Sequence, residues 1–328
     1  MKDLTKYIHS RAAAIILMVV AVCAAAISLY YTDTPAVIPE NLVPIVFISP
    51  GRWLTPSMMS FAINIAANIA IAALLLVINR TYRMVQSMTW IFVGLFFFMQ
   101  LAYPGALGYF NCGTFIALTV MSLTTLLFST YTCITLTRST YLLFFLLATA
   151  SLFQINIMLF FPVFILGTVQ MKVFDVRNIL AILMGTITPV WILAGFGVIS
   201  LSSFKTPFAV DSLSLIQSDH SVYLAGFISK TFTVGLAVIF TLVNFIKVMS
   251  YNSARRAFNG FFSLLLFAVI ILVIIDHYNS ASYVALLNIL TAYQVGHFFA
   301  IRRMRLSYVP VCIIFFIYAA LATLPIVI

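Results

Sequence analysis

The sequence predicts an all-α fold, a polytopic transmembrane helix bundle of about 11 spans that include a short hairpin at 141–169. Hydrophobic residues make up 64% of the chain and charged residues only 7%, whereas soluble domains carry about 25% charged residues. The apolar residues form long runs, such as Phe262–Ile275, instead of the apolar–polar alternation of membrane β-strands. Because a helix satisfies its backbone groups within its own segment, these runs favour helical spans.

The basic residues orient the predicted bundle. They come in short clusters between the apolar runs, which is the positive-inside pattern of cytoplasmic segments. Topology and attraction to anionic headgroups therefore explain the net charge of +10, and no nucleic-acid partner is expected. The expected partners are membrane lipids and other membrane-protein subunits. The clusters are Lys2/Lys6/Arg11, Arg80/Arg83, Arg138, Lys172/Arg177, Lys247/Arg255/Arg256 and Arg302/Arg303/Arg305.

Four spans are predicted before the hairpin. The first follows a basic start and resembles a signal peptide, but Val22 before Cys23 fits a lipoprotein cleavage site poorly. We therefore expect a retained signal-anchor helix with a cytoplasmic N-terminus. The third run ends at Pro104-Gly105, a turn signal, and the fourth ends before Arg138. The four spans are Ala12–Tyr30, Ser57–Asn79, Met88–Tyr103 and Cys112–Leu136.

The stretch Tyr141–Val169 determines the topology of everything after it. As one helix it would be about 43 Å long, well above a hydrocarbon core of roughly 30 Å. Gln154 and Asn156 also interrupt it, so we expect two short helices that turn near these residues. With this hairpin, 14 of the 17 Lys and Arg residues are cytoplasmic and the C-terminus is periplasmic; the exceptions are Arg52, Lys205 and Lys230.

Five further spans follow the hairpin, again separated by polar or basic residues. We expect one integral domain, 1–328, in an inner membrane. Two external loops, 31–56 and 201–223, are long enough to cap a cavity. The spans are Ile179–Ser200, Gly226–Ile246, Phe258–Ile275, Ala281–Ile301 and Tyr308–Ile326.

The external loops carry the candidate functional residues. Asp33 and Glu40 are carboxylates outside the first span that could serve as catalytic groups. Arg52, in the same loop, could grip a lipid phosphate through two hydrogen bonds. His220 in the second loop is a candidate acid or base, because histidine titrates near neutral pH. The competing interpretation is that both loops contain polar residues only to stay hydrated.

Charged residues are almost absent from the spans. Only Lys230 and Asp276 lie within spans or at their ends, and both are expected to reach the interface by snorkelling. This scarcity argues against an ion-coupled transporter, which usually holds charges at mid-depth.

Two sets of uncharged polar residues lie within spans. Helices can be held together by such side chains, or the side chains can line a path. The first set lies on one helix face, because its three residues are four positions apart. The second set covers an arc of about 120° around its helix, and His297 lies on the side opposite Asn288. The sets are Ser60, Asn64 and Asn68, and Asn288, Thr291 and Gln294 with His297.

Catalytic and metal-binding motifs are missing from the sequence. It has no GxxxxGK[ST] phosphate loop, no HExxH zinc motif and no GxSxG elbow. None of the cysteines, Cys23, Cys112, Cys133 and Cys312, belongs to a CxxC pair. We therefore predict no metal site and no cofactor.

Two stretches carry a resemblance to known proteins. One is Leu74–Pro104, with Asn79-Arg80 and a closing Ala102-Tyr103-Pro104. The other is Leu147–Pro189, with Phe160-Phe161-Pro162 and the turn Phe174–Asn178. Together they resemble an uncharacterised family of inner-membrane proteins of the Bacteroidota, a domain of unknown function that implies no activity.

The layout is similar, more distantly, to the GT-C superfamily of lipid-linked sugar transferases. Those proteins follow the first span with a long external loop that bears the catalytic acid, and they have a short helix pair after the fourth span. The likeness implies Asp33 as the matching carboxylate, with Glu40 as the reserve choice. Only the fragment Tyr30-Tyr31-Thr32-Asp33 matches the acidic motif that is usual in these loops.

Three functions fit these observations. The first is an inner-membrane protein of unknown activity, such as a subunit or scaffold in envelope biogenesis. The second is a GT-C-like transferase that acts on a polyprenyl-phosphate-linked substrate at the outer face. The third is a facilitator for a lipid or a small apolar solute, which needs a continuous polar path past Asn64 and Asn68.

Overall fold

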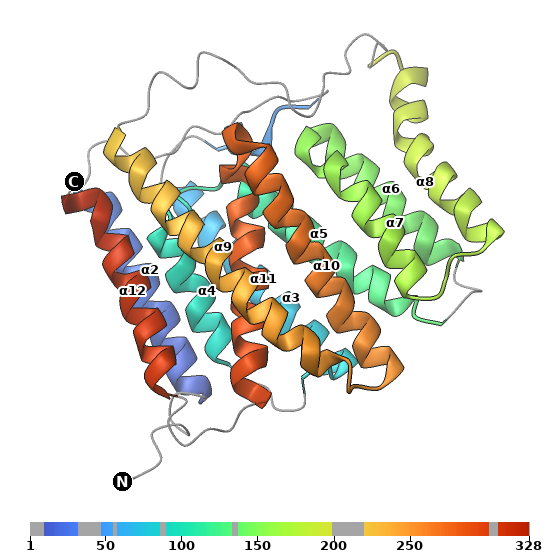
Figure 1. Cartoon of the computed structure of the whole chain (residues 1–328). Coiled ribbons are helices and arrows are strands. Elements are labelled where there is room, and N and C mark those ends of the chain that lie inside the picture. Colours follow the sequence, from blue (N-terminus) through green and yellow to red (C-terminus); the bar gives the residue numbers. More distant parts are fainter. Residues whose placement is uncertain are drawn as a thin grey trace.

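The computed structural model describes residues 10–31, 47–54, 58–85, 90–132, 137–198, 220–301 and 308–327. Within these ranges the chain forms eleven α-helices and three short 3-10 turns, with no strand (Figure 1). Six of these helices are long and apolar enough to cross a membrane, so the predicted all-α membrane helix bundle is confirmed. The elements are α2 (Arg11–Tyr31), η1 (Pro50–Arg52), α3 (Met58–Tyr82), α4 (Ile91–Ala102), α5 (Cys112–Ser129), α6 (Thr137–Phe153), η2 (Ile155–Phe160), α7 (Phe161–Gln170), α8 (Val176–Gly195), α9 (His220–Val248), α10 (Ser253–Ile275), η4 (His277–Asn279), α11 (Ala281–Ile301) and α12 (Tyr308–Val327).

The predicted spans agree with the helices best where apolar runs end at charges. The span predicted at Ala281–Ile301 coincides with α11, and that at Tyr308–Ile326 is one residue shorter than α12. The span predicted at Cys112–Leu136 was too long, because α5 ends at Ser129. Three residues later Thr132 has a positive φ of 57°, a left-handed conformation that a helix of L-residues cannot continue through.

Successive helices run in alternate directions, so the bundle has two distinct ends (Figure 1). We call the end where α2 begins the basic end, and the end where α2 finishes and α9 begins the loop end. Of the Lys and Arg residues that the structure describes, only Arg52 and Lys230 belong to segments near the loop end. Those at the basic end are Arg11, Arg80, Arg83, Arg138, Lys172, Arg177, Lys247, Arg255 and Arg256.

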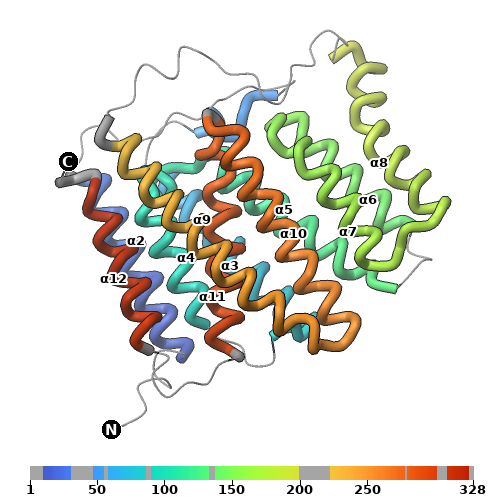
Figure 2. Tube along the Cα trace, in the orientation of Figure 1, coloured from blue at the N-terminus to red at the C-terminus, as the bar shows by residue number. Residues whose placement is uncertain are grey.

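The predicted hairpin is present. Helix α6 ends at Phe153, η2 makes the turn, and α7 runs back toward the basic end (Figure 2). The backbone N–H of Thr132, just after α5, donates to the carbonyl oxygen of Met171, just after α7, at 3.1 Å. The ends of α5 and α7 therefore meet at the same end of the bundle. At ten residues, or about 15 Å, α7 is only half of a span.

Helix α11 is the central element of the bundle. Its polar residues are as buried as its apolar ones, which is the pattern of a helix packed on all sides. The polar side chains contact different neighbours: Asn288 donates to Gln100 of α4, and Gln294 accepts from Asn244 of α9. His297 lies 3.2 Å from the hydroxyl of Tyr251 near the basic end. These contacts attach α11 to its neighbours. The polar residues of α11 therefore fit the interpretation that they hold helices together.

Helix α4 is short, and the non-helical segment 103–111 follows it. The amide of Asn64 donates to the carbonyl oxygen of Ala106 at 2.9 Å, and the N–H of Phe110 donates to Ser60 at 3.1 Å. Asn111 caps α5 by accepting from the N–H of Thr114. Non-helical backbone is tolerated at membrane depth only where other groups satisfy it. The polar face of α3 does so here.

Three helices lie at the edge of the bundle. Helix α8 packs chiefly on α6, whereas α2 and α12 both pack on α4 (Figure 1). The other faces of these helices expose large apolar side chains, among them Ile16, Trp191 and Phe316. Such faces are suited to contact with lipid hydrocarbon.

Candidate functional site

A buried lysine is the main charged feature near the loop end. Lys230 lies in α9, and only 8% of it is exposed. Its Nζ donates to the hydroxyl of Ser280 at 2.7 Å and lies 5.8 Å from the centre of the Phe227 ring. Among the residues that the structure describes, no carboxylate lies within 4 Å of this ammonium group.

A buried carboxylate lies on the same turn as Ser280. Asp276 ends α10, and its two oxygens accept from the amide of Asn279 at 2.8 Å and from the hydroxyl of Tyr283 at 3.0 Å. Burial raises the pKa of the Asp276 carboxyl, and these hydrogen bonds offset part of the rise. The turn between α10 and α11 therefore carries the Asp276 carboxyl and, four residues later, the Ser280 hydroxyl that accepts a hydrogen bond from Lys230.

His277 forms the exposed edge of this cluster. Its ring contacts Tyr223 of α9, with 3.2 Å between the tyrosine hydroxyl and Nε2. Burial and the nearby Lys230 charge lower the pKa of His277. A neutral imidazole at neutral pH can accept or donate a hydrogen bond toward a ligand above the turn.

A second polar group lies beside the start of α5. Ser49 donates to Gln154 Oε1 at 3.0 Å, and its oxygen lies 3.1 Å from Cys112 Sγ. All three side chains are fully buried. The amide nitrogens of Gln154 and Asn156 and the hydroxyl of Ser282 are buried without a hydrogen-bond partner. Buried polar atoms are normally hydrogen-bonded to protein or to an ordered water molecule, so these atoms can accept a further partner.

The two polar groups are neighbours because α5 and α11 begin side by side. A Cβ atom added at Gly113 would lie 3.1 Å from the carbonyl oxygen of Ala281, the first residue of α11. Both helices begin at the loop end (Figure 1). Their N-terminal N–H groups carry partial positive charge. Together with Lys230 and the unpaired amides, this end of the bundle favours an anionic ligand.

The predicted site residues differ in whether the structure describes them. Asp33 and Glu40 lie outside the described residues, so their role stays a prediction. Arg52 is exposed in η1, next to Trp53, which packs on the rings of Phe110, Phe115 and Phe153. His220 is the first residue of α9, and its side chain is outside the described part of the chain.

Lys230 and Asp276, which were predicted to reach the interface by snorkelling, are both buried in the bundle. Only 4% of Asp276 is exposed, and the Lys230 side chain ends on Ser280 instead of in water. The predicted span starts at Gly226, only four residues before Lys230, whereas α9 starts at His220. The lysine is therefore ten residues, or about 15 Å, into the helix.

The predicted polar face of α3 is part of a buried chain of hydrogen-bonded amides. Asn68 donates to Asn64 at 3.2 Å, Gln100 donates to Asn68 at 3.0 Å, and Asn288 donates to Gln100 at 3.2 Å. The hydroxyl of Thr114 donates to Asn64. Asn64 and Asn68 are completely buried. The chain therefore joins α3, α4, α5 and α11 and gives no support to a facilitator path at this position.

The partners of Lys230 and Asp276 were not predicted from the sequence. Ser280, Asn279 and Tyr283 are ordinary polar residues at a helix boundary, and no spacing rule connects them with a lysine 50 positions away. The one available signal was the rarity of a charge inside an apolar run.

Comparisons with known proteins add no further information: no family model, no curated protein and no solved structure matches this chain.

Proposed function

We propose that this chain is a multi-pass inner-membrane protein that binds the phosphate of a polyprenyl-phosphate-linked lipid at its periplasmic face. In this proposal the basic end faces the cytoplasm and the loop end faces the periplasm. The charges support the orientation, because nine described Lys and Arg residues belong to segments near the basic end. That asymmetry is the positive-inside pattern.

The observation that carries the proposal is Lys230. An ammonium group within a membrane costs about 3 kcal/mol, and here its described contacts are one hydroxyl and one ring. A bound phosphate would offset this cost with a charge-assisted hydrogen bond. The starts of α5 and α11 and the unpaired amides of Gln154 and Asn156 add donors of the same kind.

Binding of a polyprenyl phosphate and of the uncharged polyprenol with the same chain tests the proposal. Wild-type protein in nanodiscs should bind the phosphate, and Lys230→Met should weaken this binding about tenfold or more, the equivalent of one charge-assisted hydrogen bond. Lys247→Met is the matched control, because Lys247 lies at the basic end of the same helix. Equal binding of phosphate and polyprenol, or unchanged binding by Lys230→Met, would overturn the proposal.

A loop acid as counter-ion is the main competing explanation for Lys230. In that case Lys230→Met would destabilise the protein without ligand. A second substitution of an acid in the loop 201–223, Asp211→Asn or Asp219→Asn, would restore the stability. This outcome would also overturn phosphate binding at Lys230. The scaffold function would then be the better interpretation, and purification of the native complex would identify the partner subunits.

Asp276 favours a second candidate function, transfer of the lipid-linked group. A carboxylate with a raised pKa can accept the proton of an acceptor hydroxyl. The acceptor oxygen then bonds to the transferred group, whose bond to the phosphate breaks, and the lipid phosphate leaves with the electron pair. Lys230 would balance the charge that forms on that phosphate. The GT-C-like layout of the sequence supports the same reaction class, with Asp276 in place of Asp33 as the base.

Release of polyprenyl phosphate from a polyprenyl-phosphate hexose tests this candidate. Asp276→Asn should lower the release about a hundredfold or more while phosphate binding is retained. Asp33→Asn decides between the two carboxylates, because the GT-C likeness expects this variant to be inactive instead. If neither substitution changes the rate, or if wild-type protein releases nothing, the transferase candidate is excluded.

A further inference from the structure

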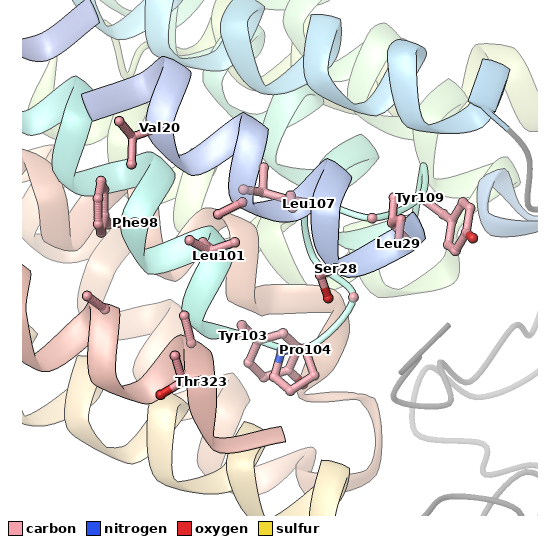
Figure 3. A pocket seen from close by; sticks show the side chains of 16 residues that line it. Val20, Ser28, Leu29, Phe98, Leu101, Tyr103, Pro104, Leu107, Tyr109 and Thr323 are labelled. Atoms are coloured by element: carbon pink, nitrogen blue, oxygen red, sulfur yellow. The ribbon is translucent and has the colours of Figure 1, made fainter. Parts of the chain in front are cut away.

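A groove opens between α2 and α12 in the half of the bundle nearer the loop end. Its volume is about 310 Å³, which lies within the range of small-molecule sites. Helix α4 forms its floor, and the segment after α4 closes it at the loop end (Figure 3). In Figure 3, Val20 and Phe98 lie at one end, and Leu29 and Tyr109 lie at the other.

Small side chains create the groove. Ala24 and Ala25 of α2 line one wall, and Ala319 and Ala322 of α12 line the other. Small residues in membrane helices usually let two helices approach closely. Here α2 and α12 pack on α4 instead, and Phe98 of α4 contacts Phe315 of α12 with ring centres 5.2 Å apart. The two small-residue walls therefore face each other across an open space.

The surroundings of the groove identify its occupant as hydrocarbon. The faces of α2 and α12 beside it expose large apolar side chains, including Val19, Ile27 and Phe316. These helices are mainly apolar, so the mouth of the groove opens toward lipid. Its lining is mainly apolar, with hydroxyl groups of Ser28, Tyr109 and Thr323 among the lining side chains.

The length of the groove fits one leaflet. Its lining on α2 extends from Val20 to Leu29, or about 14 Å along the helix, which is close to half of a 30 Å hydrocarbon core. Asn64 donates from inside the bundle to the carbonyl oxygen of Ala106, in the segment that closes the groove at the loop end. That contact holds the closing segment in place without a ligand, so the site is preformed.

We infer that this groove holds one acyl chain of a glycerophospholipid from the leaflet at the loop end. The acyl chain would lie along Ala24 and Ala322, with its headgroup near Ser28, Tyr109 and Thr323. The seated chain would fill the gap between α2 and α12, which makes the lipid an integral part of the wall of the bundle. This inference is independent of phosphate binding at Lys230, because no residue of α9 lines the groove.

Photo-crosslinking tests the inference. The purified protein is placed in nanodiscs of phosphatidylethanolamine and phosphatidylglycerol, where a fraction of the phosphatidylglycerol carries a diazirine on one acyl chain. Labelled peptides are then located by mass spectrometry. We expect enrichment on the groove walls relative to Ile187 and Trp191, which expose an ordinary lipid-facing surface on α8. Equal labelling of the groove and of α8 would overturn the inference.

Matched substitutions on α12 separate the groove from its surroundings. Ala319→Phe fills the groove and should reduce its labelling to the level of α8, whereas Ala320→Phe adds the same ring to an exposed neighbour outside it. If Ala319→Phe does not fold, Ala322→Leu gives a smaller filling. Labelling that neither filling variant reduces would contradict the inference, as would displacement of the probe by polyprenyl phosphate. Lys230→Met should leave the labelling unchanged, so that the two proposals can fail separately.

Discussion

Gly185 lies where α8 crosses α6, and it allows the closest approach between these helices. A Cβ atom added there would lie 2.6 Å from the carbonyl oxygen of Tyr141 and 3.1 Å from both Phe144 Cβ and the backbone nitrogen of Phe145. Two of these three atoms belong to the α6 backbone and cannot rotate away. Since ordinary contact begins at 3.4 Å, the helices would have to separate by about 0.8 Å at this point.

Gly185→Ala should therefore destabilise the protein even though alanine is the better helix former. Forced overpacking costs about 1–3 kcal/mol, and replacing a helical glycine by alanine recovers about 1 kcal/mol. We expect a net loss of about 1 kcal/mol. Gly235→Ala is the matched control in α9, because no atom lies within 4 Å of the added Cβ. That variant should gain up to about 1 kcal/mol.

Thermal unfolding in detergent measures the difference between the two variants. A difference of about 2 kcal/mol corresponds to a separation of about 3 °C in Tm for a chain of this size. Gly185→Leu should lower Tm further, since its side chain extends deeper into α6. If Gly185→Ala is as stable as Gly235→Ala, then α8 does not pack on α6 as closely as described.

Three further predictions concern the loop end. Asn64→Leu removes the donor to Ala106, and we expect a loss of about 1–2 kcal/mol in thermal unfolding; full retention of Tm would contradict the role of this amide. Burial raises the pKa of Asp276 in the folded state, so the contribution of this carboxyl to stability should be greatest below about pH 4 and fall as the pH rises through the raised pKa. Urea unfolding at several pH values should show this fall in wild type and not in Asp276→Asn, and a rise would refute the sign. Trp53→Ala removes a ring that packs on three phenylalanines, and we expect it to lower stability by about 1–2 kcal/mol and to speed proteolysis within 47–54. The control Trp191→Ala, at an exposed position on α8, should change neither the stability nor the proteolysis.

The fold was predictable where single residues interrupt long apolar runs. Gln154 and Asn156 broke the run Tyr141–Val169, and its excess length required a turn there. The structure has that turn, with α6 ending at Phe153. Bilayer thickness and backbone hydrogen bonding alone decide this feature, so it can be read from composition.

The site was less predictable because its contacts join distant segments. Lys230 meets Ser280 across 50 residues, and neither residue has a neighbour in sequence that points to the other. The start of α9 was placed six residues late, at Gly226 instead of His220. The candidate residues Asp33 and Glu40 depend on loop geometry that periodicity does not encode.

The amides of α3 have a consequence for the way the chain enters the membrane. As a lone helix in lipid, α3 would expose Ser60, Asn64 and Asn68 without the partners that they have in the bundle. Those partners, Phe110, Ala106 and Gln100, are synthesised 32 to 50 residues later. We therefore expect α3 to remain beside the insertion machinery until α4 and α5 have emerged. The three helices would then enter the bilayer as one unit, with the polar face of α3 already covered.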